Sequence, residues 1–468
     1  MSPKVINLIF SEVFLMFCFF FSSAQPTTLT LRTAIQTALA NYGSIKAKNN
    51  YLNSSRALLE ETRKEYLPDL SISAQQDYGS VNGQNGVLYG YRGLSTGSSG
   101  PALSAQNWNA AFGGLYLANI NWDFFSFGKA KLKIRISKSV LARDSNDLSQ
   151  EQFQQKIKVA AAYLNLLAAQ RLYLSQLHNL DRALALRTVV VSRAKNGLNA
   201  GVDSSLANAE VSAARIALTR AKDVQQENNN HLAELMGVVP EDFTIDTFFI
   251  ARIPFAISDS IQSQQTIHPV LKFYQSRISL SNDQARYFRS FNFPTFSLFS
   301  VFQGRGSGFD YDYGELNPGA YTNSYSKGIS PVRGNYLAGV GMIWNLTNPL
   351  RVQQLVASQK FLSRAFQDEY DLVDQQLKDQ LLLARSKMDN ALENYKEVPV
   401  QLKAAEDAYL QKTVLYKNGL TNIVDVTQAL YALYRAEADR DITYANVWQA
   451  LLLRAAASGD FLIFENEF

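Results

Sequence analysis

The sequence predicts a mainly α-helical fold built as two tandem repeats, with four short strands suited to a membrane. The motif Lys-Asn-Gly-Leu, followed by Val-Asp, occurs in residues 195–203 and again 222 residues later in 417–425. Motifs repeated at such a distance indicate a duplicated fold. Residues 129–195 contain neither proline nor glycine, which predicts one helix of roughly 100 Å. Four short segments alternate apolar and polar residues with the period of a strand.

Residues 1–24 have the pattern of a secretory signal peptide, with Lys4, an apolar core and small residues before a cleavage site after Ala24. Cys18, the only cysteine, lies inside this segment, and Phe17 before it is too large for a lipoprotein signal. The mature chain is therefore expected to be exported without thiols or disulfides. No later segment reaches the roughly 18 consecutive apolar residues of a membrane helix, so any crossing must use strands.

The first repeat is predicted to begin with a helix that ends before Pro68, because the residue preceding a proline is disfavoured in the α region. Leucines at 167, 174, 177 and 184 have coiled-coil spacing along the long helix. The first and last helices of the repeat together match the long helix in length, so they are expected to line it end to end. The predicted elements are a helix (32–66), a strand (70–75), a polar loop (79–112), a strand (115–122), the long helix (129–195) and a return helix (204–235).

The second repeat follows the same plan after a linker. Its predicted elements are a helix (268–291), a strand (296–302), a loop (304–335), a strand (336–344), a long helix (348–417) and a return helix (426–457). Pro399 lies inside the long helix, where it should remove one backbone hydrogen bond and kink the helix. The domains expected are a signal peptide (1–24), a first repeat (25–236), a linker or equatorial region (237–266) and a second repeat with a C-terminal equatorial segment (267–468).

Four strands of about ten residues match the roughly 9–11 residues that cross a bilayer when tilted. Four strands cannot close a barrel, and each backbone group left unpaired in lipid costs several kcal/mol, so several chains must assemble. The number of strands alone allows a dimer, a trimer or a tetramer. Aromatic residues near the strand ends suit the two membrane interfaces: Tyr116, Trp122, Phe124, Phe125, Phe293 and Trp344.

The chain resembles the TolC-like outer-membrane efflux proteins over nearly all of 28–460. The resemblance lies in an order of elements that occurs twice: a helix, Leu-Pro or Phe-Pro, two strands, a long helix and a Gly-Leu-x-x-x-Val-Asp turn. The resemblance implies a homotrimer with a 12-stranded outer-membrane β-barrel, four strands per chain, continued by a long α-helical coiled-coil periplasmic barrel. It also implies the outer membrane of a diderm bacterium, with a large periplasmic portion. The implied function is a passive conduit for tripartite efflux or type I secretion.

The same resemblance implies the partners: a periplasmic adaptor (membrane fusion) protein, an inner-membrane pump and outer-membrane lipid. In the family, an aspartate in Val-Asp-Val rings the closed periplasmic pore, and Asp425 matches it. Gln428 stands where relatives often have a second aspartate, and Asp203 occupies the first copy of the turn. The alternative role of both aspartates is helix capping, with Asn422 and Asp425 spaced as in a capping box.

The repeated turns offer further candidate residues, in which glycine followed by leucine fits a helix C-cap with its hydrophobic contact. In the family these exposed tips meet the adaptor. The lysines before the turns either complement the helix dipole or contact the adaptor. The adaptor-contact candidates are Gly197, Leu198, Gly419, Leu420, Lys195 and Lys417.

No enzyme motif occurs in the sequence, and we expect no catalytic residue, cofactor or metal. His178, His231 and His268 are scattered without partners at metal-ligand spacing. The balance of 45 basic and 41 acidic residues is too mild to indicate nucleic acid binding. The alternative to a channel is an exported coiled-coil scaffold or adhesin without a pore. The cargo stays open, since drugs, metals, siderophores and polypeptides use similar conduits.

Overall fold

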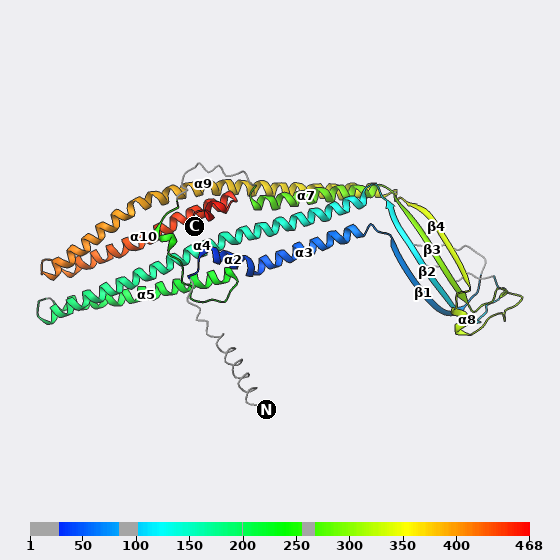
Figure 1. Cartoon of the computed structure of the whole chain (residues 1–468), viewed down its shortest axis with the longest axis horizontal. Coiled ribbons are helices and arrows are strands. Elements are labelled where there is room, and N and C mark those ends of the chain that lie inside the picture. The colour runs from blue at the N-terminus through cyan, green and yellow to red at the C-terminus, as the bar shows by residue number, and fades with distance from the viewer. Residues whose placement is uncertain (1–27, 84–101, 199, 255–266) are drawn as a thin grey trace, which may run out of the picture. The chain divides into compact units, whose positions relative to one another are not determined.

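The computed structural model describes residues 28–83, 102–198, 200–254 and 267–468, so the predicted signal peptide lies outside it (Figure 1). The chain forms two compact units, and both repeats contribute to each. The first unit is drawn from Met1–Leu52, Arg143–Ser276 and Phe366–Phe468, and the second from Asn53–Ala142 and Arg277–Ala365. None of the helices in the described ranges combines the length and hydropathy that crossing a membrane requires.

The first unit consists of helices. It contains α2 (Leu31–Asn41), α5 (Gly201–Met236), α6 (Phe248–Ala251), α10 (Ile423–Ser458) and α11 (Leu462–Glu465). It also contains parts of α3 (Gly43–Lys64), α4 (Lys129–Lys195), α7 (Pro269–Arg289) and α9 (Asn348–Lys417), which continue into the second unit. The 67-residue α4 and the 70-residue α9 begin and end at the residues predicted for the two long helices, 129–195 and 348–417.

The core of the first unit is aromatic. Trp448 and Phe464 are fully buried, and Phe249 packs edge-on against Trp448 with the ring centroids 4.8 Å apart. The indole nitrogen of Trp448 donates to the carbonyl of Arg252 at 3.1 Å. Residues 243–251 of the predicted linker thus pack into the main core, whereas 255–266 lie outside the described residues.

The shorter helices α3 and α5 line α4, as their lengths predict. Lys48 on α3 forms an ion pair with Asp147 on α4, and Ala183 of α4 packs with Val211 and Ala214 of α5. Gly237, the C-cap of α5 with a φ of 68°, lies against the last residue of α2, where an added Cβ would come 3.0 Å from the Asn41 carbonyl carbon.

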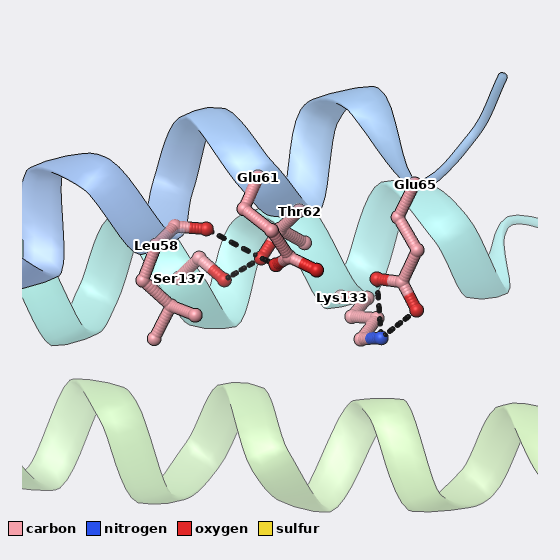
Figure 2. A network of polar contacts seen from close by, with 6 residues as sticks. All are labelled: Leu58, Glu61, Thr62, Glu65, Lys133 and Ser137. Atoms are coloured by element: carbon pink, nitrogen blue, oxygen red, sulfur yellow. Dashed lines mark hydrogen bonds and ion pairs between the residues drawn. The ribbon is translucent and has the colours of Figure 1, made fainter.

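Polar contacts also join α3 to α4 within the second unit (Figure 2). The hydroxyls of Thr62 and Ser137 share a buried hydrogen bond of 2.9 Å, and Thr62 also donates to the Leu58 carbonyl. Lys133 binds the carboxylate of Glu65, and this hydrogen bond raises the pKa of Lys133. The pair therefore holds α3 beside α4 close to where the strands begin.

The second unit contains a four-stranded antiparallel sheet in the order β1-β2-β3-β4 (Figure 1). The strands are β1 (Asp69–Ser80), β2 (Ala110–Phe125), β3 (Thr295–Ser307) and β4 (Arg333–Ile343). A short helix, α8 (Tyr325–Ile329), precedes β4, and a 3-10 turn at Ser290–Asn292 precedes β3. Since β1 and β4 are the outer strands, each has one edge without a partner strand in the described chain.

The two faces of this sheet differ in polarity. Residues paired directly across strands share a face, so the register assigns each side chain. One face is almost entirely apolar and largely exposed, Ile72 reaching 83% and Tyr336 86%. Its members include Leu70, Ile72, Ala74, Tyr116, Ala118, Ile120, Trp122, Phe296, Leu298, Phe302, Tyr336, Ala338, Val340 and Met342, with Gln76, Ser80 and Ser300 as polar exceptions. The other face includes Asp69, Ser71, Ser73, Gln75, Asp77, Asn119, Asn121, Gln303, Arg305, Arg333 and Asn335, among several apolar residues.

Helix α8 packs on the apolar face, at the end of the sheet opposite to the long helices α4 and α9. Gly114 and Gly306 make this approach possible, because added Cβ atoms would come within 2.6 Å of the Ile329 carbonyl and 2.5 Å of the Ser330 carbonyl. Tyr116 donates from its hydroxyl to the Ile329 carbonyl at 3.1 Å. The segment before β4 therefore covers part of a face that is otherwise open.

Several predicted boundaries were wrong. The helix expected at 32–66 is broken at Tyr42, whose ψ of 125° is extended and which precedes the poor helix former Gly43. All four strands extend into the regions predicted as loops, and α8 was not predicted. Helix α9 continues through Pro399, which removes one donor without ending the helix. A sharper kink there than in α4 stays a prediction.

Candidate functional site

The two repeated turns close two helical hairpins, α4–α5 and α9–α10, in the same way. Gly197 has a φ of 72° and Gly419 a φ of 76°, the left-handed region that glycine tolerates best. Leu198 donates its backbone N–H to the Arg193 carbonyl, and Leu420 to that of Leu415, each at 2.9 Å. Both turns are thus C-caps of the type their sequence predicts.

The two return helices start differently. Asn422 is the N-cap of α10, and its side-chain oxygen accepts from the Asp425 backbone N–H at 2.9 Å. The equivalent residue in the first repeat is Ala200, which offers no side-chain cap to α5. The second hairpin therefore has a cap that the first lacks.

Asp425 is held by its own hairpin. Its carboxylate accepts from the Lys412 ammonium and from the Thr421 hydroxyl, each at 2.7 Å. These two hydrogen bonds lower the pKa of Asp425. The reciprocal half of the predicted capping box, from the Asp425 side chain to the Asn422 backbone, is replaced by these contacts. In the single chain the carboxylate is thus stabilised in its charged form.

The remaining candidates at the tips are largely exposed. Leu198 and Leu420 are 66% and 71% exposed, so neither buries the hydrophobic contact that often accompanies such a cap. Gln428 is exposed one helical turn after Asp425, and Asp203 is half-buried in the first turn of α5. Lys195 and Lys417 are exposed in the last turns of α4 and α9.

A row of three arginines on α4 joins the first hairpin to the second. Arg171, Arg182 and Arg193 are spaced by 11 residues, close to three full helical turns, so they share one face of α4. We call them the arginine row. We did not single out these residues from the sequence, although their constant spacing is a signal that could have identified them.

Each member of the arginine row contacts a residue of the second hairpin. Arg182 binds Glu437 through two parallel hydrogen bonds of 2.9 and 2.6 Å, with both side chains about four-fifths buried. Arg193 donates to the Lys417 carbonyl at 2.8 Å. Arg171 lies 3.7 Å from the carboxylate of Asp441. The Arg182–Glu437 contact, which is charge-assisted and bidentate, belongs to the stronger polar interactions in proteins.

Further contacts between the hairpins lie beside this row. Tyr431 on α10 donates from its hydroxyl to Glu210 on α5 at 2.8 Å, a bond that raises the pKa of Tyr431. Gln176 binds the Tyr434 hydroxyl. An apolar cluster spans both hairpins near the tips, with Leu186, Val190 and Ala207 from the first and Tyr416, Ile423 and Val426 from the second. The two hairpins are therefore joined by polar and apolar contacts together.

Two of the predicted interface aromatics occupy equivalent positions in the two repeats. The indole nitrogen of Trp122 donates to the Tyr66 carbonyl at 2.9 Å, and that of Trp344 donates to the Asn292 carbonyl at 3.0 Å. Both acceptors lie two residues before the prolines, Pro68 and Pro294, that open the strands. Each tryptophan thus satisfies a carbonyl where a helix gives way to a strand.

The other predicted aromatics also lie near the helix–strand junctions, with one exception. Phe125 packs against Phe127 at 4.8 Å between ring centroids, and Phe127 stacks on Phe293 at 5.3 Å. Phe124 contacts Trp122 at 6.1 Å. Tyr116 lies elsewhere, under α8.

The histidines do not converge. His268 is buried, with its Nδ1 accepting from the Val270 backbone and its Nε2 placed 3.0 Å from the Ala456 carbonyl. Burial lowers the pKa of His268. In the described ranges no three His, Cys, Asp or Glu side chains are arranged to hold a metal ion.

With this geometry in view, comparisons with known proteins give a consistent result. Residues 34–238 match the model of the outer membrane efflux protein family. By sequence and by fold, the chain resembles the outer membrane efflux proteins. No curated protein matches the chain in sequence.

Solved structures share this fold over nearly the whole chain. The outer membrane protein VceC from Vibrio cholerae is 16% identical, with a TM-score of 0.71 over 92% of this chain and 96% of VceC. The Campylobacter jejuni outer membrane channel CmeC is 16% identical, with a TM-score of 0.70 over 92% of this chain and 85% of CmeC. The open state of the Neisseria gonorrhoeae outer membrane channel MtrE is 16% identical, with a TM-score of 0.66 over 92% of this chain and 89% of MtrE.

Proposed function

We propose that the chain is one subunit of a trimeric outer-membrane channel that exports substrates passively across the periplasm and the outer membrane. Three copies would supply twelve strands to a closed barrel, continued by a helical barrel in the periplasm. A periplasmic adaptor and an inner-membrane pump would complete a tripartite efflux or type I secretion system. Energy would come from the pump, and this chain would provide the conduit.

The observation that carries this proposal is the four-stranded sheet. Its outer strands β1 and β4 each have an open edge in the described chain, and one face is apolar and exposed. Open edges in lipid leave backbone groups unpaired, which closure with neighbouring copies removes. An apolar outer face and a more polar inner face are what a membrane barrel requires. The family match and the shared fold with VceC, CmeC and MtrE support the same conclusion.

The hairpin tips are proposed as the periplasmic gate, with Asp425, Gln428 and Asp203 near the mouth. Exposed Leu198 and Leu420, with Gly197, Gly419, Lys195 and Lys417, are proposed to meet the adaptor. Opening would separate the hairpins of each chain, which the arginine row and the Tyr431–Glu210 bond hold together in this conformation. Gating is thus assigned to contacts that helix movement can break.

The rival function is an exported coiled-coil scaffold or adhesin without a pore. A soluble scaffold would have to expose the apolar face of the sheet to water, and continuous exposed apolar surfaces are unusual in soluble proteins. Neither the family match nor the solved structures favour this alternative.

Three measurements test the proposal. The protein is expected in the outer-membrane fraction, as a trimer by mass measurement in mild detergent, and as a conducting pore in planar bilayers. Placing arginine at Ala118, on the apolar face of β2, should cost roughly 2–4 kcal/mol per chain at the bilayer midplane. A folded monomer, or a soluble rod that washes off the membrane, would refute the channel.

A further inference from the structure

A pair of arginines lies on the polar face of the sheet, on neighbouring strands. The register places Arg305 of β3 directly opposite Arg333 of β4. Like charges directly opposite each other destabilise a sheet, so the pair is unfavourable for folding. Such a pair calls for an explanation outside the stability of the chain.

The surroundings of the pair do not neutralise it. In the same row across the sheet, Arg305 is followed by Leu115 on β2 and Gln75 on β1, neither of which is charged. Both guanidinium groups belong to exposed residues, and in the described part of the chain neither has an ion-pair partner. The nearest acidic position on this face is Asp77, one row farther out on β1.

The Asp77 carboxylate lies over β2 and does not neutralise Arg305 and Arg333. An added Cβ on Gly113 would come 2.3 Å from its Oδ1, so the carboxylate lies above that glycine. Gly113 pairs with Ser307, the residue two beyond Arg305. Arg305, Arg333 and Asp77 together leave one net positive charge per chain at this end of the polar face.

The position of the pair along the strands is also defined. Arg305 is two residues before the end of β3, and Arg333 begins β4, so both lie at the end of the sheet far from the helices. In a barrel whose apolar face meets lipid, the polar face lines the lumen. This end is then the outer mouth.

We propose that Arg305 and Arg333 form a cationic ring just inside the outer mouth of the barrel, which makes the channel selective for anions. The inference rests on the proposed function and deepens it, because it names negatively charged solutes as the favoured cargo class. Three copies place six guanidinium groups around one lumen. Rings of arginine or lysine select anions in other pores, and low-dielectric walls focus the field of such charges.

The ring acts on conduction by electrostatics alone and needs no bound ligand. At an ionic strength of about 0.1 M the screening length is about 10 Å, so the field extends well into the lumen. At about 1 M the length falls to about 3 Å, and the selectivity should weaken. The size of the effect is therefore expected to depend on salt.

The test is the reversal potential of the purified trimer in planar bilayers under a KCl gradient. The wild type is expected to favour chloride over potassium. Arg305→Gln with Arg333→Gln should reduce the ratio of chloride to potassium permeability, and Arg305→Glu should reduce it further. Lys327→Gln is the matched control, because it removes one exposed charge from α8 on the other face of the sheet. Its ratio should equal that of the wild type.

Each outcome is decisive. The cationic ring is refuted if the wild-type channel prefers potassium. It is also refuted if the double variant forms an intact trimer with an unchanged permeability ratio. Neither result contradicts the proposed channel function. An equal effect of Lys327→Gln also overturns it, since the charge would then act from outside the lumen. A wild type that forms no pore refutes the proposed function itself, and the inference with it.

Discussion

The joint between the two hairpins can be tested by removing its polar contacts. In the proposed gate, Arg182→Gln removes the bidentate bond to Glu437, and Tyr431→Phe removes the bond to Glu210. Both substitutions keep much of the side-chain volume. The double variant is expected to separate the hairpins more easily and to leave the pore open for longer.

The size of the effect follows from burial. Exposed ion pairs contribute about 0–1 kcal/mol, whereas breaking a fully buried pair costs about 3–5 kcal/mol. Arg182 and Glu437 are about four-fifths buried, which places their contribution near 2 kcal/mol. The Tyr431 side chain is half exposed, so its bond to Glu210 adds only about 0.5–1 kcal/mol. At about 1.4 kcal/mol per factor of ten, the closed-to-open ratio should fall by roughly 100-fold.

The assay is single-channel conductance, with trimer stability on gels as a check of folding. Lys378→Gln is the control, because Lys378 pairs with Asp374 on its own helix α9 and joins nothing to the other hairpin. Adding Glu437→Gln to Arg182→Gln should change little further, since the pair is already broken. If the intact double variant has the conductance and open time of the wild type, these contacts do not hold the pore closed.

Five other substitutions have defined outcomes. Asn422→Ala should lower the stability of its hairpin by about 1 kcal/mol, and Ala200→Asn should raise that of the other by a similar amount, as measured by hydrogen exchange. Trp344→Phe keeps the ring but removes the indole donor, so the trimer should lose about 0.5–1.5 kcal/mol per chain in denaturant unfolding. Because the folded pKa of His268 is lowered, stability should fall as pH drops below about 6.5, and His268→Gln should flatten that part of the thermal stability profile. Asp425→Asn should weaken cation block of the pore if a carboxylate ring gates it, and unchanged block would show that the residue serves its hairpin alone.

The acid behaviour of Asp425 has two opposing causes. Symmetry copies of one carboxylate around a narrow mouth should raise their pKa, as like charges disfavour ionisation. Within one chain, Lys412 and Thr421 lower it. A rise in the assembled pore stays a prediction, and it must overcome these two contacts. Titration of cation block against pH in the trimer would measure the net result.

Helices and strands followed from local chemistry. The ends of α4 and α9 were predicted because glycine and proline bound long stretches of good helix formers. Strand positions followed from alternation after Pro68 and Pro294. Strand lengths did not, because pairing between β2 and β3 continues through glycines such as Gly306, whose poor strand propensity suggests a loop.

The candidate site was predictable where it depended on the backbone. The C-caps at Gly197 and Gly419 were confirmed, since a glycine after a helix has few other roles. Side-chain partners were not predictable, because Lys412 is 13 residues from Asp425, and Glu437 is 255 from Arg182. The first pair meets because the second hairpin folds back on itself, and the second pair meets because the two hairpins pack together. Local sequence encodes neither contact.

The arginine row has no counterpart in the second repeat. The positions 222 residues after Arg171, Arg182 and Arg193 are Glu393, Ala404 and Leu415. Three proposed subunits would bring six hairpins to one mouth, with the two hairpins of each chain held together by arginine contacts. While these contacts hold, the six hairpins would move as three pairs, one from each chain. Breaking the arginine contacts would let all six hairpins move independently.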